Sequence, residues 1–252
     1  MPTGYTPAVT AVVTPRSRVG AALVTRRYDP SAHAAGGSMP ITRRGQSSDT
    51  LTVTCECYGS SRAADQGRSN QDAFWIARGE LVGAVLCDGA GRAEQCAAGV
   101  VRRFAAEIES GALEHARFPS WKRWLTGTDA GLVGGAQTTF VAVAVVEDRL
   151  VGACAGDSRA FLVNEHGCRL ITTERTPRLG SGAANPTAIH ERLAPRDVVL
   201  LMTDGAWGPL SVSVIHAAVM SRTLGHLADL APALLDIAGA RERADDMTIV
   251  AL

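Results

Sequence analysis

The chain has 252 residues, 46% of them hydrophobic and 20% charged, and its 25 Lys and Arg residues are balanced by 25 Asp and Glu residues. This length and composition are typical of one globular domain, and the charge balance excludes a long-range field that would attract nucleic acid or anionic lipid. No run approaches the roughly 18 continuous apolar residues of a membrane-spanning helix. We therefore expect a cytoplasmic protein with no membrane or nucleic-acid partner.

Residues 1–48 differ in composition from the rest of the chain. They are rich in Pro, Thr, Gly, Ala and Arg, and Asp29 is their only acidic residue. Such a composition is typical of disorder. The sequence predicts a disordered basic leader over residues 1–48 and a folded domain over residues 49–252, and a solvated leader is favoured over an arm that docks on a polyanion.

The β pattern begins at Leu51. Residues 51–59 alternate between apolar and polar, and residues 81–89 form a nearly continuous apolar run, which is typical of a strand buried on both faces. Apolar side chains at helical spacing predict a helix over residues 93–110 that ends at Gly111. Residues 118–127 predict a second, shorter helix whose two tryptophans pack into the core.

The second half of the chain predicts strands first and helices later. Four short strands, expected at residues 138–147, 149–157, 159–165 and 168–173, are joined by turns and would form an antiparallel meander. A loop at 177–187, a buried strand at 197–205, two helical stretches within 211–241 and a terminal strand at 247–252 follow. This order predicts an α+β fold, with two packed antiparallel β-sheets flanked by helices on both sides.

Two aspartates stand where predicted buried strands end. Asp88 and Asp204 each follow an apolar run and precede a glycine. A buried carboxylate must be neutralised, hydrogen-bonded or bound to a metal, and several converging carboxylates favour a hard cation such as Mg²⁺ or Mn²⁺. Asp-Gly is also a favoured hairpin turn. That alternative is weakened by further aspartates that flank predicted strands, namely Asp72, Asp157, Asp245 and Asp246.

Six segments of the chain resemble motifs of the PP2C (PPM) family of metal-dependent serine/threonine phosphatases. They are NQDAF, VLCDGAGR, TTFVAVAV, AGDSRAFLV, VLLMTDGAWG and ADDMTIVAL, in the family's order and at roughly its distances. The resemblance extends from about residue 51 to the last residue. It implies a PP2C-like β-sandwich with a two-metal centre at one end.

The resemblance also implies a role for each matching residue. Asp88 would bridge both metals, and the Gly89 carbonyl would bind the first metal. Asp204 and Asp245 would complete the second metal site. Asp157 would hold a weaker third metal together with Asp204, and Asp72 would orient metal-bound water. Asp246 replaces the asparagine of the family's Asp-Asn-x-Thr motif and is not assigned as a ligand.

The chemistry follows from the ions. A water that bridges two Mn²⁺ or Mg²⁺ ions is acidified and can attack phosphorus in line, while the metals neutralise charge on the phosphate oxygens. The resemblance therefore implies hydrolysis of phosphoserine and phosphothreonine in proteins, without a covalent enzyme intermediate. The expected partner is a phosphorylated protein, either a Ser/Thr kinase or its target. The chain resembles bacterial stand-alone members of the family, and we expect a monomer.

The match departs from the family at the substrate side of the site. Gly67 holds the position of the usual phosphate-binding arginine, and Arg68, one residue later, is the candidate replacement because a guanidinium binds phosphate oxygens in pairs. Ala90 stands where some members have a histidine proposed as general acid, which leaves leaving-group protonation to metal-bound water. The family's flap segment is shortened to residues 174–193.

Four alternatives to a two-metal phosphatase fit parts of the sequence. Cys87 and Arg92 resemble the loop of a cysteine-dependent phosphatase, but four residues separate them where that family has five, and the neighbouring Asp88 would raise the thiol pKa. A nucleotide-binding module would need the Walker lysine or a full dinucleotide fingerprint, and the glycine-rich turn here has neither. Cys55 and Cys57 share one strand face, but no CxxC pair or histidine completes a zinc set.

The main alternative function is a catalytically inactive PP2C-like scaffold that binds phosphoproteins.

Overall fold

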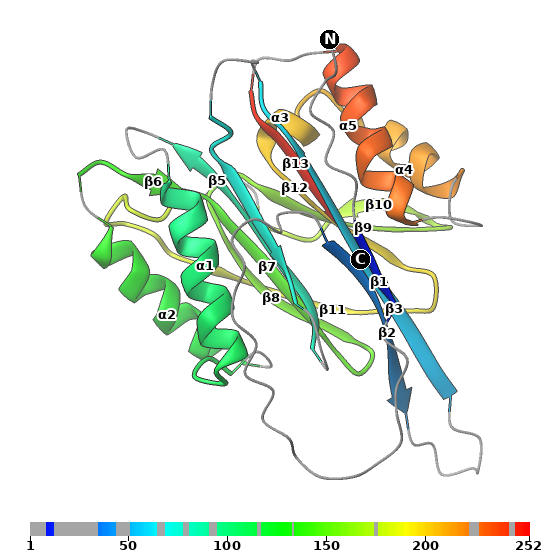
Figure 1. Ribbon diagram of the computed structural model, residues 1–252, viewed down its shortest axis with the longest axis horizontal. Coiled ribbons are helices and arrows are strands. Elements are labelled where there is room, and N and C mark those ends of the chain that lie inside the picture. Colours follow the sequence, from blue (N-terminus) through cyan, green and yellow to red (C-terminus); the bar gives the residue numbers. More distant parts are fainter. Residues whose placement is uncertain are drawn as a thin grey trace.

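Two β-sheets pack face to face in the computed structural model, and helices cover both outer faces (Figure 1). The structure describes residues 9–12, 35–43, 51–64, 69–77, 81–90, 95–114, 117–132, 134–173, 176–221, 227–241 and 245–252. The predicted α+β sandwich is therefore confirmed.

The larger sheet contains seven strands in the order β1-β2-β3-β13-β12-β9-β10. Its members are β1 (Val9–Val12), β2 (Ala35–Arg43), β3 (Leu51–Arg62), β13 (Met247–Ala251), β12 (Val198–Met202), β9 (Arg159–Asn164) and β10 (Gly167–Leu170). All neighbours are antiparallel except β1 and β2, which run parallel at one edge. The C-terminal strand β13 thus lies in the middle of the sheet, between β3 and β12.

The smaller sheet has the order β11-β8-β7-β5-β4, and the short strand β6 pairs with β5 beside it. Its members are β11 (Thr187–Arg192), β8 (Arg149–Ala155), β7 (Phe140–Val146), β5 (Val82–Ala90), β4 (Asp72–Ile76) and β6 (Gln137–Thr138). Every pair in this sheet is antiparallel.

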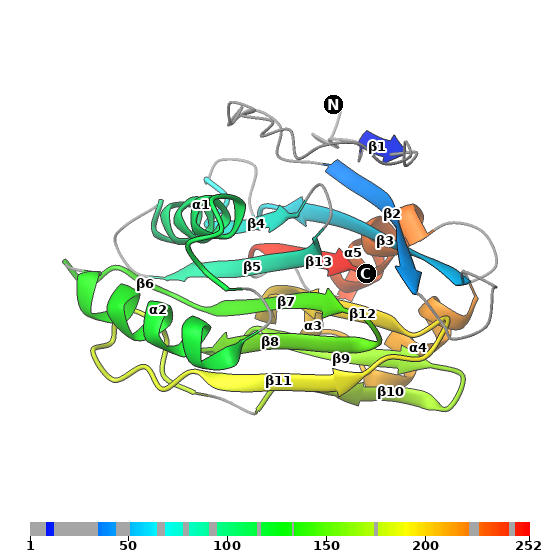
Figure 2. The same cartoon turned by 90° about the horizontal axis from the view of Figure 1, so that it is seen from below.

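The helices divide between the two outer faces (Figure 2). The smaller sheet is covered by α1 (Cys96–Glu109) and α2 (Phe118–Gly131), and the larger sheet by α3 (Asp204–Trp207), α4 (Val212–Met220), the 3₁₀ turn η1 (Leu227–Asp229) and α5 (Leu230–Arg241). Both helices predicted before residue 130 are present. Trp121 of α2 is almost fully buried and contacts Phe104 of α1 edge to face, as expected for core tryptophans.

Strand β12 shows why its sequence is apolar at every position. Val199 and Leu201 face the layer between the two sheets, whereas Leu200 and Met202 face the helices outside the larger sheet. Both faces of the strand are therefore covered, so its sequence is a continuous apolar run instead of an alternation of apolar and polar residues. Burial of each such side chain stabilises the fold by about 1.5–3 kcal/mol. The two strands that lead to the expected metal ligands, β5 and β12, are both packed on their two faces.

Two details of the expected arrangement were wrong. The four strands read as one meander are split, because β7 and β8 belong to the smaller sheet, whereas β9 and β10 belong to the larger one. Residues 156–158 carry the chain from one sheet to the other. The sequence predicts loop and flap at residues 187–192, but they form β11, an edge strand in which Ile189 alone is buried. One inward side chain is too weak a pattern to predict a strand.

The region read as a basic leader contains β1 and β2, and β2 pairs with β3 along residues 37–43. The rest of residues 1–48 lies outside the described part of the chain, so the predicted leader and its boundary stay predictions. No helix in the described ranges is long and apolar enough to cross a membrane.

Candidate metal centre

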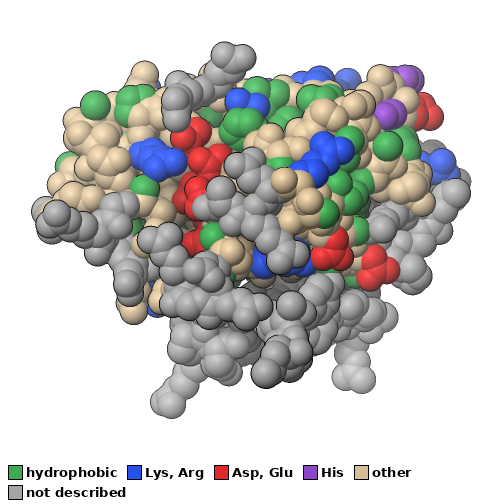
Figure 3. Space-filling view, turned by 90° about the horizontal axis from the view of Figure 1, so that it is seen from above, with side chains coloured by type: hydrophobic (Ala, Val, Ile, Leu, Met, Phe, Trp, Pro, Cys, Tyr) green, Lys and Arg blue, Asp and Glu red, His purple; other side chains and the backbone are tan. Residues whose placement is uncertain are grey.

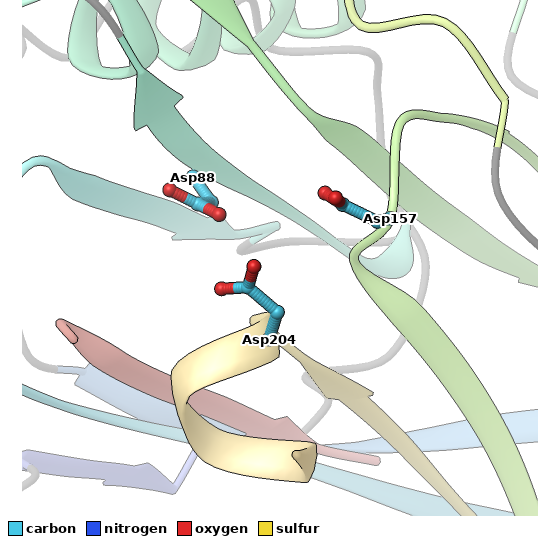
Figure 4. Close-up of side chains that lie close together, drawn as sticks. All are labelled: Asp88, Asp157 and Asp204. Atoms are coloured by element: carbon cyan, nitrogen blue, oxygen red, sulfur yellow. The ribbon is translucent and has the colours of Figure 1, made fainter. Parts of the chain in front are cut away.

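Three carboxylates from three different elements meet at one end of the sandwich. Asp88 lies near the end of β5, Asp157 lies in the connection between β8 and β9, and Asp204 is the first residue of α3 (Figure 4). One oxygen of each lies within 4.8 Å of the others. Asp204 is the most exposed of the three, with 32% of its side chain accessible. Figure 3 shows acidic side chains gathered on one face of the molecule.

Hydrogen bonds fix the backbone of Asp88. Its N–H donates to the hydroxyl of Thr139 at 2.8 Å, and its carbonyl accepts from the Thr139 N–H and the Thr138 hydroxyl, both at 2.9 Å. The Thr139 hydroxyl also pairs with that of Ser158 at 2.6 Å. All of these groups are buried. The TTF and GDS motifs thus tie the strand that carries Asp88 to the turn that carries Asp157.

Close backbone contacts explain the glycine after each aspartate. A Cβ atom on Gly89 would lie 2.7 Å from the Gln71 carbonyl oxygen, and one on Gly205 would lie 2.2 Å from the Asp246 carbonyl oxygen. Neither Asp-Gly pair forms a hairpin turn, because Asp88 and Gly89 lie within β5 and Asp204 begins a helix. The glycines instead let neighbouring backbone approach the carboxylates.

Trp207 and Arg159 hold the turn that carries Asp157. The indole N–H of Trp207 donates to the Asp157 carbonyl at 3.1 Å, and the Arg159 guanidinium lies 3.4 Å from the centroid of the Trp207 ring. A cation over an indole face is an attractive arrangement. Because Trp207 belongs to α3, this contact also sets the distance between Asp157 and Asp204.

Asp72 stands opposite Asp88 on the neighbouring strand β4. Its Oδ2 accepts hydrogen bonds from the hydroxyls of Thr203 at 3.0 Å and Thr248 at 2.8 Å. Its Oδ1 is buried and has no hydrogen-bond partner among the described residues. Burial raises the pKa of Asp72 to about 7, although the two hydroxyls lower it.

Burial also raises the pKa values of Asp88 and Asp204. Neighbouring carboxylates add to the shift in both cases: Asp72 and Asp204 act on Asp88, and Asp157 and Asp245 act on Asp204. Such crowding of negative charge is relieved by protonation or by a nearby positive charge. The converging carboxylate oxygens of Asp88, Asp157 and Asp204, beside a buried and unpartnered oxygen of Asp72 on the strand next to Asp88, fit the preference of Mg²⁺ and Mn²⁺ for oxygen ligands.

The remaining predicted residues are placed differently. Asp245 is exposed, and its carboxylate accepts a 2.9 Å hydrogen bond from the Asp246 N–H. Asp245 lies beside α3, but it does not belong to the group formed by Asp88, Asp157 and Asp204. The Asp246 carboxylate holds backbone instead, because it accepts the N–H groups of Ala64 at 2.8 Å and Gln71 at 2.7 Å. Arg68 lies outside the described residues.

Sequence reasoning missed Arg178. Its guanidinium reaches into the carboxylate group, with Nη2 at 3.0 Å and 3.2 Å from the two carboxylate oxygens of Asp157. The same nitrogen lies 3.8 Å from one oxygen each of Asp88 and Asp204. Arg178 lies in the predicted loop at 177–187, and no pattern in that segment indicates where its side chain points.

Comparisons with known proteins agree with this geometry. Residues 81–252 match the family described as Stage II sporulation protein E (SpoIIE). Solved structures with the same fold include a bacterial serine phosphatase, at 20% identity and a TM-score of 0.70, covering 77% of this chain and 96% of that chain. Serine/threonine phosphatase Stp1 from Staphylococcus aureus matches at 21% identity and a TM-score of 0.66, covering 77% of this chain and 93% of that one.

A third structure is the catalytic domain of the serine/threonine protein phosphatase PstP in complex with two manganese ions. It matches at 19% identity and a TM-score of 0.65, and the match covers 77% of this chain and 96% of that one. No curated protein matches the chain in sequence. The family match spans more than half of the chain and includes Asp88, Asp157 and Asp204. The chain therefore belongs to the SpoIIE family and has the PP2C-type serine/threonine phosphatase fold that its sequence predicted.

Proposed function

We propose that this chain hydrolyses phosphoserine and phosphothreonine in proteins at a centre of two Mn²⁺ or Mg²⁺ ions. The observation that carries the proposal is the convergence of Asp88 and Asp204, which offer oxygens within 4.8 Å of each other and of Asp157. The unpartnered, buried Oδ1 of Asp72 supports it, since an orphaned carboxylate oxygen is costly unless a ligand completes its environment. The PstP catalytic domain, which shares the fold, was solved with two manganese ions.

The ligands in this proposal are those that the resemblance assigns. Asp88, the Gly89 carbonyl, Asp204 and Asp245 would hold the two ions. Divalent cations bound here would supply Lewis acidity toward water and would neutralise charge on the phosphate.

Asp72 acts as the proton acceptor in this proposal. Its Oδ2 is committed to the hydroxyls of Thr203 and Thr248, so Oδ1 is the atom left to take a proton from the attacking water. The two threonine hydroxyls also fix the orientation of the carboxylate. The backbone N–H of Thr248 in turn donates to the Thr203 hydroxyl at 2.9 Å, which orients that hydroxyl toward Asp72.

The substrate class follows from the fold family and stays part of the proposal. A phosphorylated protein, either a Ser/Thr kinase or its target, would present its phosphate to the acidic end of the sandwich, in the cytoplasm. The phosphate-binding role suggested for Arg68 remains a prediction. Positioning of the reactants and electrostatic stabilisation of the transition state supply most of the catalysis in phosphoryl transfer. No covalent intermediate on the protein is therefore required.

The test is an assay of p-nitrophenyl phosphate and a phosphothreonine peptide with Mn²⁺, with Mg²⁺ and with a chelator. We expect turnover that requires the divalent ion and is lost in Asp88→Ala and Asp204→Ala. Asp236→Asn is the matched control, because Asp236 is an exposed aspartate whose partner Arg62 lies on β3. Loss of such a surface ion pair changes little.

The outcomes separate the two functions. Manganese-dependent turnover in wild type and Asp236→Asn but not in the two site variants supports the phosphatase. Absence of turnover from folded protein with every divalent ion overturns it. Retained capture of the phosphothreonine peptide by that inactive protein would instead favour the scaffold.

A further inference from the structure

We propose that Arg178 takes the place of a third metal ion at Asp157, so that the centre holds two divalent cations and one guanidinium. The inference rests on the two-metal centre proposed above. It departs from the expectation that Asp157 and Asp204 hold a weaker third metal.

The contacts of Arg178 are centred on Asp157 and not on the whole cluster. Nη2 reaches both carboxylate oxygens of Asp157 at 3.0 Å and 3.2 Å, and Nε reaches Oδ1 at 3.3 Å. The distances from Nη2 to Asp88 and Asp204, both 3.8 Å, are too long for hydrogen bonds. The guanidinium therefore uses the oxygens of Asp157 that a third cation would need, and it leaves Asp88 and Asp204 available.

The main chain on both sides of Arg178 is fixed. Before it, Thr176 is bonded to Gly156: its N–H donates to the Gly156 carbonyl at 3.1 Å, and its hydroxyl accepts the Gly156 N–H at 2.9 Å. After it, Leu179 is fully buried and exchanges hydrogen bonds of 3.0 Å and 2.9 Å with Thr138. Arg178 is thus attached next to Asp157 on one side and next to the Asp88 strand on the other.

A buried aspartate of α2 completes the support. Asp129 accepts the N–H groups of Gly180 at 2.7 Å, Gly182 at 3.2 Å and Ala184 at 3.1 Å. These three bonds hold the residues that follow Leu179 in one shape. Because the segment is fixed in this way, the Arg178 side chain is pre-organised to bind Asp157. An ion that displaced Arg178 would break the paired hydrogen bonds to Asp157, and no gain in loop mobility would compensate for their loss.

Charge excludes a third ion while Arg178 remains in place. A guanidinium keeps its charge at every pH at which the protein is folded. A divalent cation on Asp157 would need the same two oxygens that Nη2 and Nε contact at 3.0–3.3 Å, whereas Nη2 stays 3.8 Å from Asp88 and Asp204, so repulsion is strongest at Asp157. Two divalent ions and one guanidinium neutralise the same carboxylates with less repulsion between cations than three divalent ions and the guanidinium would.

The experiment counts bound Mn²⁺ in the whole chain, by the EPR signal of the free ion during titration, without substrate. We expect wild type to saturate at two Mn²⁺ ions. Arg178→Ala gains a third, weaker site, and Arg178→Ala with Asp157→Asn returns to two. Arg178→Gln provides a second variant of similar shape, in case the alanine variant does not fold. Arg192→Ala is the control, because Arg192 is an exposed arginine of β11 paired with Asp148.

Each result decides between the alternatives. Two ions in wild type and Arg192→Ala, with a third in Arg178→Ala or Arg178→Gln, support the inference. Three ions in wild type, or only two in the Arg178 variants, overturn it and leave the phosphatase proposal intact. Fewer than two ions in wild type overturn both, because the two-metal centre itself would then be absent.

Discussion

Asp129 of helix α2 accepts a 2.7 Å hydrogen bond from the backbone N–H of Gly180, two residues after Arg178. Asp129 is far from Gly180 in sequence and is 7% exposed, and it also binds the N–H groups of Gly182 and Ala184. One buried carboxylate therefore fixes the conformation of the segment that delivers Arg178 to the candidate metal centre.

Asp129→Ala should lower the free energy of unfolding by about 3 kcal/mol, because it removes charge-assisted hydrogen bonds and leaves backbone donors unsatisfied. Urea denaturation measures this difference. Thr126→Ala, on the exposed side of the same helix, is the control and should stay within about 0.5 kcal/mol of wild type. Equal stability of the two variants would show that the segment holds its shape without Asp129.

Asp246→Asn should separate structure from metal binding. Both oxygens of Asp246 accept backbone N–H groups, and an amide would turn its own NH₂ toward one of those donors. We expect a loss of about 1–2 kcal/mol in the free energy of unfolding. The number of Mn²⁺ ions bound should be unchanged. A loss of one bound ion in this variant would instead identify Asp246 as a ligand.

The stability of the metal-free protein should fall as pH rises. The pKa of Asp72 is raised from 3.8 to about 7 by burial, so between these values the folded state keeps a proton that the unfolded state has released. The free energy of unfolding then decreases with pH across this window, and the loss is complete above pH 7. Asp88, whose pKa is also raised, extends the decline to higher pH.

Asp72→Asn tests this titration directly. Its amide oxygen can accept the two threonine hydroxyls, but the side chain has no charge to lose. With chelator present, urea denaturation at pH 5, 6, 7 and 8 should give a shallower decline for the variant, which should exceed wild type in stability at the highest pH. Parallel curves for the two proteins would exclude Asp72 as the titrating group. Addition of Mn²⁺ to wild type should oppose the decline, because the ion binds the deprotonated carboxylates.

Gly205→Ala and Gly99→Ala should shift stability in opposite directions. A Cβ on Gly205 would lie 2.2 Å from the Asp246 carbonyl oxygen, so the backbone at Gly205 or at Asp246 would have to move. We expect a loss of about 3 kcal/mol or more. Gly99, inside α1, has open space around its Cβ position, so alanine there should add about 0.5–1 kcal/mol through better helix propensity. Thermal and urea unfolding of both variants provide the comparison.

The sequence alone determined the sandwich and the family. Its strands and helices have strong local patterns: β5 and β12 are continuous apolar runs because they are covered on both faces, and α1 places its buried residues at helical spacing. Motif order then indicated the PP2C-like fold. The convergence of Asp88, Asp157 and Asp204 could be expected from the same motifs, because each stands where a buried strand ends.

Only the tertiary structure decided how distant residues combine around these aspartates. Local patterns do not tell which sheet a strand joins, so the crossing between β8 and β9 was missed, and β11 has a single buried side chain to indicate it. The contact between Arg178 and Asp157 depends on a loop that Asp129 of helix α2 holds in place. The pairing of Asp72 with Thr203 and Thr248 likewise joins β4 to the start of α3 and to β13, since hydrogen bonds between separate elements exist only once the chain has folded.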